Sequence, residues 1–295
     1  MQRVPRIIMR TTSPSPASRE REGPGPQGWE GEGSPPPADL PSPASLCEPP
    51  PAHRRCATRE GAVRERGFDA RLYRLLAWFS PGFPIGAFSY SHGLEAAADH
   101  STVHDRETLQ HWIAAVVTLG AGRMDADTLR DVHRAASAQD LDALAAANRR
   151  GLAFRATSEM ALEATAQGAA FLATCRAAWP DPLLDRWEAM LQETGDAVCH
   201  AAAVGAVTAG AGIPLACVLT AYLQAMAANL VSVGLRLGIV GQTDGQRILA
   251  ALEPVVGTAI TDALTREPCA FGGAALAVEL ASMRHETQYT RLFRS

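Results

Sequence analysis

From Phe68 onward the chain carries apolar residues at helical spacing, with few prolines and no run of alternating β-branched residues. Within residues 68–79, one face of a helix collects Leu72, Leu75, Leu76 and Phe79 before Ser80-Pro81 ends it. The same pattern predicts helices over residues 89–99, 105–120 with Gly120 as C-cap, 125–137, 140–150, 154–179 and 181–194 with Pro182 at its first position. We therefore expect an all-α fold of nine to eleven helices without a strand.

Residues 201–235 contain no charged side chain, so their length alone would allow a membrane span. Gly212 and Pro214 interrupt the run, Gln224 and Asn229 lie in its second half, and alanine and glycine supply most of it. These features favour a buried hairpin and argue against a membrane protein. The expected fold is a single-domain bundle of about ten helices around a central apolar helical hairpin.

The first 66 residues hold thirteen of the twenty prolines and almost no periodic apolar pattern. Such a segment buries too little surface to offset its ordering entropy. We predict a disordered Pro/Arg-rich extension at residues 1–66 and an all-α domain at 67–295 that ends in a tail, 284–295. We interpret the extension as dispensable rather than as a targeting signal, because it has no apolar core segment.

Composition excludes several classes of function. All 27 basic residues are arginine, so a lysine Schiff base and the lysine of a P-loop are both ruled out. The formal net charge is −4 and the arginines are scattered, which gives no electrostatic support for binding nucleic acid. The six cysteines form no CxxC pair, which is typical of a reduced, cytoplasmic protein.

No pattern of residues indicates a catalytic or metal site. His100 and His104 are expected in a loop, and the neighbours Cys199 and His200 are expected to pack at a helix start. Glu159 and Glu163 could pair as an acid and a base, but without a partner group a solvated face is expected for both. An all-α enzyme with an apolar pocket formed by the hairpin stays open as a hypothesis; a cavity lined by unpaired carboxylates would support it.

Three polar stretches fit none of these classes of site. "SPGFPIGAFSYSHGLE" contains Pro81, Gly86, Ser89, Tyr90, Gly93 and Glu95. "RLGIVGQTDGQ" contains Arg236, Gly241, Gln242, Thr243 and Gln246; Thr243 and Gln246 have the form of a capping box, and Arg236 would face the negative end of a helix dipole. The third is the tail "RHETQYTRLFRS". Between the first and second stretches lies a further run, "RATSEM", with Arg155 and Glu159.

In this order and at these distances, the stretches resemble the UreF family of urease accessory proteins over about residues 68–295. The resemblance implies an all-α protein with no catalytic residues and no cofactor of its own, nickel concerning it only through the complex. It implies a homodimer that binds UreD (also called UreH), recruits the GTP-binding protein UreG and acts on apo-urease in the cytoplasm as an adaptor for nickel insertion. His92 stands where the family more often has glutamine, so it is the residue at which a nickel contact would be tested.

The resemblance leaves a second role open, that of a GTPase-activating regulator of UreG that supplies an arginine. The candidates are Arg236, Arg291 and Arg294. For the tail we predict partner binding, because aromatic residues and arginine are enriched at the centres of interfaces. The predicted contacts are Arg284, Tyr289, Arg291, Phe293 and Arg294, with His285 and Glu286 folding back on the domain as a hinge.

Overall fold

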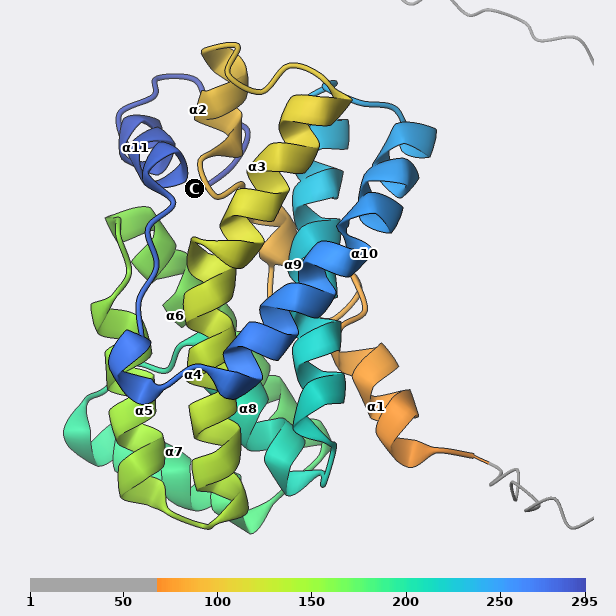
Figure 1. Ribbon diagram of the computed structural model, residues 1–295. Coiled ribbons are helices and arrows are strands. Elements are labelled where there is room, and N and C mark those ends of the chain that lie inside the picture. Colours follow the sequence, from red (N-terminus) through yellow and green to blue (C-terminus); the bar gives the residue numbers. More distant parts are fainter. Residues whose placement is uncertain (1–67) are drawn as a thin grey trace, which may run out of the picture. The chain divides into compact units, whose positions relative to one another are not determined.

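The computed structural model describes residues 68–295, and the extension predicted at 1–66 lies outside them. The described part is all-α and contains eleven α-helices with two short 3-10 helices and no strand, which confirms the predicted fold class (Figure 1). The α-helices are α1 (Ala70–Trp78), α2 (Leu94–Asp99), α3 (Arg106–Thr118), α4 (Ala121–Ser137), α5 (Leu141–Ala153), α6 (Ser158–Ala178), α7 (Pro182–Thr194), α8 (His200–Gly210), α9 (Leu215–Arg236), α10 (Gln242–Thr265) and α11 (Leu276–His285), and the 3-10 helices are η2 (Ala87–Ser89) and η3 (Pro268–Ala270).

The uncharged run forms α8 and α9, as the predicted hairpin requires. Every residue of α8 from Ala201 to Thr208 is buried, and α8 packs mainly on α4 and α6. Gly168 explains the close approach of α6, because a Cβ there would lie 2.3 Å from the carbonyl oxygen of Val198. The two arms of the hairpin thus find most of their contacts on other helices rather than on each other.

Helix α9 packs on α10, α3 and α4, and Figure 1 shows α9 and α10 side by side. Both helices have the length and the composition of a membrane span. Among the residues that α9 buries completely are Leu219, Leu223 and Leu230. Leucines buried in this way are typical of a core helix of a helical domain, and 44% of the apolar stretch in α9 and 28% of that in α10 are buried.

Several local predictions need correction. The helix predicted from residue 89 begins only at Leu94, because His92 and Gly93 both have positive φ, 51° and 72°. The capping box of Thr243 and Gln246 is absent, since α10 begins at Gln242 with Gly241 as its N-cap and no side-chain cap. Gly120 is not the C-cap of α3, a position that belongs to Leu119.

Helix α1 also differs from its prediction. Its buried residue is Trp78, whereas Leu72 and Leu76 on the predicted apolar face are 55% and 67% exposed. The spacing of apolar residues was correct for a helix, and Leu75 and Phe79 of the same face are partly buried against the core. Pro182, by contrast, lies at the first turn of α7 as predicted, behind the N-cap Asp181.

Candidate functional site

The first polar stretch turns twice before α2 begins, and glycines make both turns possible. Gly86 and Gly93 each have φ of 72°, a left-handed conformation that other residues adopt at a cost. A Cβ on Gly93 would lie 2.6 Å from the backbone nitrogen of Ser282 in α11. The glycine therefore lets α2 and α11 meet closely, and Figure 1 shows the C-terminus lying between these helices and α3.

Glu95 in the first turn of α2 binds the C-terminal segment, residues 286–295. Its carboxylate accepts hydrogen bonds from the backbone N–H groups of Leu292 at 2.6 Å and Phe293 at 2.9 Å. The same carboxylate lies 3.0 Å from Nε2 of His285. Glu95 is only 7% exposed, so these bonds replace the water that a free carboxylate would hold.

Glu159 completes this cluster from the N-terminal turn of α6. Its Oε2 atom lies 2.8 Å from Nδ1 of His285, and its Oε1 atom accepts a bond of 2.8 Å from Arg291. His285 is fully buried and Glu159 is 8% exposed. Two acidic and two basic residues from α2, α6, α11 and the C-terminal segment thus form one network, which is buried except for Arg291, whose side chain is 39% exposed. We call it the latch cluster: Glu95, Glu159, His285 and Arg291.

Backbone and aromatic contacts hold the end of the segment beside the latch cluster. Arg294 donates its backbone N–H to the carbonyl of Ser89 at 2.7 Å, and Ser91 donates its own to the carbonyl of Ser295 at 2.7 Å. Phe293 is 4% exposed, and the guanidinium of Arg236 lies 4.3 Å from the centre of its ring. Arg236 also donates to the carbonyl of Phe88 at 2.5 Å. The first and third polar stretches and Arg236 therefore meet in space.

A second buried network lies in the middle of the domain. Asp125 in α4 pairs with Arg155, and it accepts a bond of 2.9 Å from the hydroxyl of Tyr222 in α9. Burial raises the pKa of Tyr222 well above its ordinary value, so the phenol stays protonated as a donor. Burial lowers the pKa of Arg155, but the opposing attraction of Asp125 is larger in sum and leaves that pKa raised. The guanidinium of Arg155 therefore keeps its charge beside Asp125.

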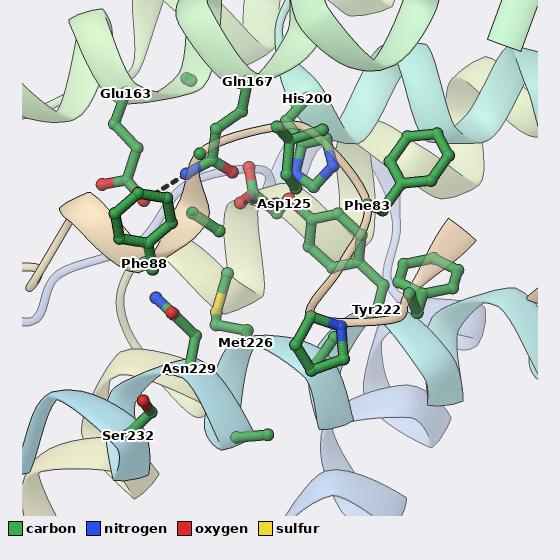
Figure 2. A pocket seen from close by; sticks show the side chains of 18 of the residues that line it. Phe83, Phe88, Asp125, Glu163, Gln167, His200, Tyr222, Met226, Asn229 and Ser232 are labelled. Atoms are coloured by element: carbon green, nitrogen blue, oxygen red, sulfur yellow. Dashed lines mark hydrogen bonds between the residues drawn. The ribbon is translucent and has the colours of Figure 1, made fainter. Parts of the chain in front are cut away.

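This network lines a cavity of about 490 Å³ between α4, α6, α8, α9 and residues 78–88. Figure 2 shows Glu163, Gln167 and His200 at one side of the cavity, and Met226, Asn229 and Ser232 at the other. Desolvation lowers the pKa of His200 to about 4, so its ring is neutral at pH 7. The volume falls within the range of small-ligand pockets, roughly 300–1,000 Å³.

The carboxylates of the cavity are paired. Glu163 lies 3.1 Å from Nε2 of His92 and accepts a bond of 2.9 Å from Gln167 (Figure 2). Desolvation is the largest single effect on His92 and lowers its pKa. Attraction by Glu163, the hydrogen bond with Glu163 and attraction by Asp125 together outweigh it, so the pKa of His92 is raised. The hypothesis of an enzyme pocket with unpaired carboxylates therefore gains no support from these residues. The solvated face predicted for Glu159 and Glu163 is wrong, because both are buried.

The remaining predicted residues lie elsewhere. Four predicted residues lie at the start of α10 and make none of the contacts described above: Gly241, Gln242, Thr243 and Gln246. Glu286 is exposed and accepts bonds from Ser158. Arg284 and Tyr289 are exposed as well, the tyrosine by 102%. Partner binding by the tail and the hinge role of His285 and Glu286 both stay predictions.

Sequence reasoning missed the role of Asp125, Tyr222 and His200. One signal was present: an aspartate four residues before Leu129 on a helix face that is otherwise apolar. Pro81, which was predicted within a motif, lines the cavity.

Among residues 68–295 no group of three or more His, Cys, Asp and Glu side chains is placed to hold a metal ion.

Fold and site together define an all-α protein in which paired charges fix a C-terminal segment on the domain. The model of the UreF family matches residues 103–253. The chain is 46% identical to the urease accessory protein UreF of Rhodopseudomonas palustris (strain BisB18) over 238 residues, which is 81% of this chain and 98% of that protein. It is 46% identical to UreF of Granulibacter bethesdensis over 77% of this chain and 95% of the relative, and 44% identical to UreF of Azorhizobium caulinodans over 79% and 99%.

The chain belongs to the UreF family of urease accessory proteins.

Proposed function

We propose that this chain is a non-enzymatic adaptor in urease maturation. In this role it links UreD to the GTP-binding protein UreG, so that nickel is inserted into apo-urease, and it acts in the cytoplasm as a homodimer. The names of its relatives support the process, and the three motifs support the finer assignment. The proposal assigns nucleotide chemistry to UreG, in keeping with a chain that has no lysine.

The observation that carries the proposal is how the C-terminal segment is held. Phe293 is anchored in the domain, whereas Tyr289 and Leu292 are 102% and 65% exposed. On the preceding helix, Leu280 and Met283 are 44% and 47% exposed. A segment that is already ordered loses less entropy on binding than a free one. Exposed aromatic and apolar side chains beside arginines are the composition of an interface centre.

The test is copurification of the full chain with UreD and UreG of the same organism. A ternary complex is expected from the unmodified chain. Tyr289→Ala should weaken it by roughly tenfold or more, because truncation of a hot-spot aromatic costs about 2 kcal/mol or more. Failure to recover any complex from well-folded proteins would contradict the adaptor role. A complex that is indifferent to Tyr289→Ala would leave the role standing and move the interface elsewhere.

A regulator of GTP hydrolysis is the second candidate, and one observation favours Arg294 as its arginine. Arg291 is bound to Glu159 and Arg236 is bound to Phe88, whereas the guanidinium of Arg294 makes no hydrogen bond or ion pair with residues 68–295 and lies 6.0 Å from the ring of Tyr90. An arginine that enters another protein's active site must be free to reach it.

Arg294→Ala should then reduce GTP turnover by UreG in the complex by about 10³–10⁵-fold without preventing assembly. Arg247→Ala is the matched control, since Arg247 is an exposed arginine of α10 whose only ion pair within residues 68–295 is with Asp244. If assembly and turnover fall together, Arg294 is an interface residue and the regulator hypothesis is wrong for it.

A further inference from the structure

His285 lies between two carboxylates and has no access to solvent. Its Nδ1 atom is 2.8 Å from Glu159 and its Nε2 atom is 3.0 Å from Glu95, and its exposure is 0%. A neutral imidazole carries one N–H and can satisfy only one of these contacts. The other nitrogen would then turn a lone pair toward a carboxylate oxygen at hydrogen-bond distance. With both glutamates ionised, both contacts are favourable only when both ring nitrogens carry a proton.

The charges around His285 lead to the same assignment. Among the elements packed on α11, α2 contributes Glu95, α6 contributes Glu159, and the C-terminal segment contributes Arg291. With His285 as imidazolium the cluster holds two negative and two positive charges. With a neutral ring it would hold a net negative charge in a site where Glu95 and Glu159 are 7% and 8% exposed. Uncompensated charge is costly in such surroundings.

No further charge from the helix of His285 compensates the cluster. Its neighbours Arg284 and Glu286 are exposed, and Glu286 is engaged by Ser158. The next buried ion pair, His92 with Glu163, is complete in itself. The proton on His285 is therefore the element of the latch cluster whose loss leaves the two carboxylates opposed by Arg291 alone.

We propose that His285 is a positioning residue whose imidazolium holds Glu95 and Glu159 in place, so that Glu95 binds the backbone of the C-terminal segment and the segment is released when His285 loses its proton. Glu95 is the link, because one carboxylate serves His285, Leu292 and Phe293 at once. Glu159 adds a second link through Arg291. The latch cluster lies within this chain, so its contacts do not depend on binding to UreD or UreG.

The decisive experiment uses the unmodified full chain. Nuclear magnetic resonance follows the ring of His285 and the backbone amides of Leu292 and Phe293 from pH 5.5 upward. Amide exchange is corrected for its intrinsic pH dependence with the exposed Tyr289 as reference. We expect a ring with two N–H groups at the lower pH, and a loss of at least tenfold in protection of both amides at the pH where the ring loses one proton. A neutral ring throughout, or amides that stay protected after deprotonation, would overturn the proposal.

Two variants separate charge from shape. His285→Gln keeps hydrogen-bonding atoms but not the charge, and it should lower the protection of the Leu292 amide at least tenfold at pH 6. In the pair His285→Gln with Glu159→Gln, one amide can donate to Glu95 and accept from residue 159, so part of the protection should return and its pH dependence should vanish. His104→Gln is the matched control, because His104 is an exposed histidine beside Asp105. Equal protection in His285→Gln and His104→Gln would contradict the assignment.

Discussion

Replacing Phe293 with alanine is expected to release the C-terminal segment without unfolding the domain. Phe293 is 4% exposed and its ring lies under the guanidinium of Arg236. Truncating a buried phenylalanine to alanine costs about 3–5 kcal/mol, and loss of the cation–π contact is included in that change at about 0.5–1 kcal/mol. In a closed core of this size the same cost would lower the Tm by roughly 6–20 °C.

The position of Phe293 near the end of the described chain limits that effect. The segment can open locally, so the loss of global stability cannot exceed the free energy with which the segment docks. We therefore expect protection of the Leu292 and Arg294 amides to fall by at least a hundredfold, since about 3 kcal/mol is worth more than two decades. The Tm should fall by less than the closed-core range. Both amides donate bonds that the docked segment needs, to Glu95 and to the carbonyl of Ser89.

Tyr289→Ala is the matched control for this prediction. Tyr289 is an aromatic residue of the same segment, and it is 102% exposed. Its removal should leave exchange of the Leu292 and Arg294 amides and the Tm unchanged. Unchanged protection in Phe293→Ala, or the same loss in both variants, would refute the reasoning that Phe293 anchors the segment.

Three further outcomes test the interior. Gly168→Ala should destabilise the domain by about 1–3 kcal/mol in denaturant unfolding, because its Cβ would lie 2.3 Å from the carbonyl of Val198; an unchanged midpoint would show that α6 and α8 adjust freely. Asp125→Ala should cost about 3–5 kcal/mol, since it leaves the buried guanidinium of Arg155 without its partner, and a loss below 1 kcal/mol would contradict the pairing. The pKa of His200 is lowered to about 4 from an ordinary 6.5, so the unfolded chain binds the proton first and the stability of the domain should fall as pH drops from 6.5 toward 4. Over that range the Tm of His200→Leu should therefore rise relative to the Tm of the unmodified chain. A Tm difference that does not change with pH would refute a neutral, buried His200.

The sequence predicted most of the helices because each depends on residues close in the chain. Periodic apolar residues indicated α3 to α7, and the uncharged run indicated α8 and α9. The predicted helix boundaries were wrong where the backbone conformation, rather than the apolar pattern, determines where a helix begins. Positive φ at His92 and Gly93 delayed α2, and Gly241 started α10 before Thr243 could cap it.

The site was only partly predictable, because its partners are distant in sequence. Glu95, Glu159 and His285 were each singled out within a motif, but their meeting joins residues 126 and 190 positions apart. Glu159 and Glu163 seemed solvated because no partner was visible nearby, and the partners proved to lie in the C-terminal segment and at His92. Asp125 was taken for the polar start of a helix, whereas α4 begins four residues earlier and buries it.

The latch cluster also sets an order for the folding of a chain that is made from its N-terminus. Domains begin to fold during synthesis, and α3, α4, α8 and α9 can pack before α11 has left the ribosome. Glu95 and Glu159 must spend that time hydrated and without His285, whose codon is read 190 residues after that of Glu95. Closing so long a loop is slow relative to local helix packing. The pairing of these two carboxylates with His285 is thus among the last steps of folding. Until then the nascent chain exposes to solvent two acidic side chains that are buried in the folded domain.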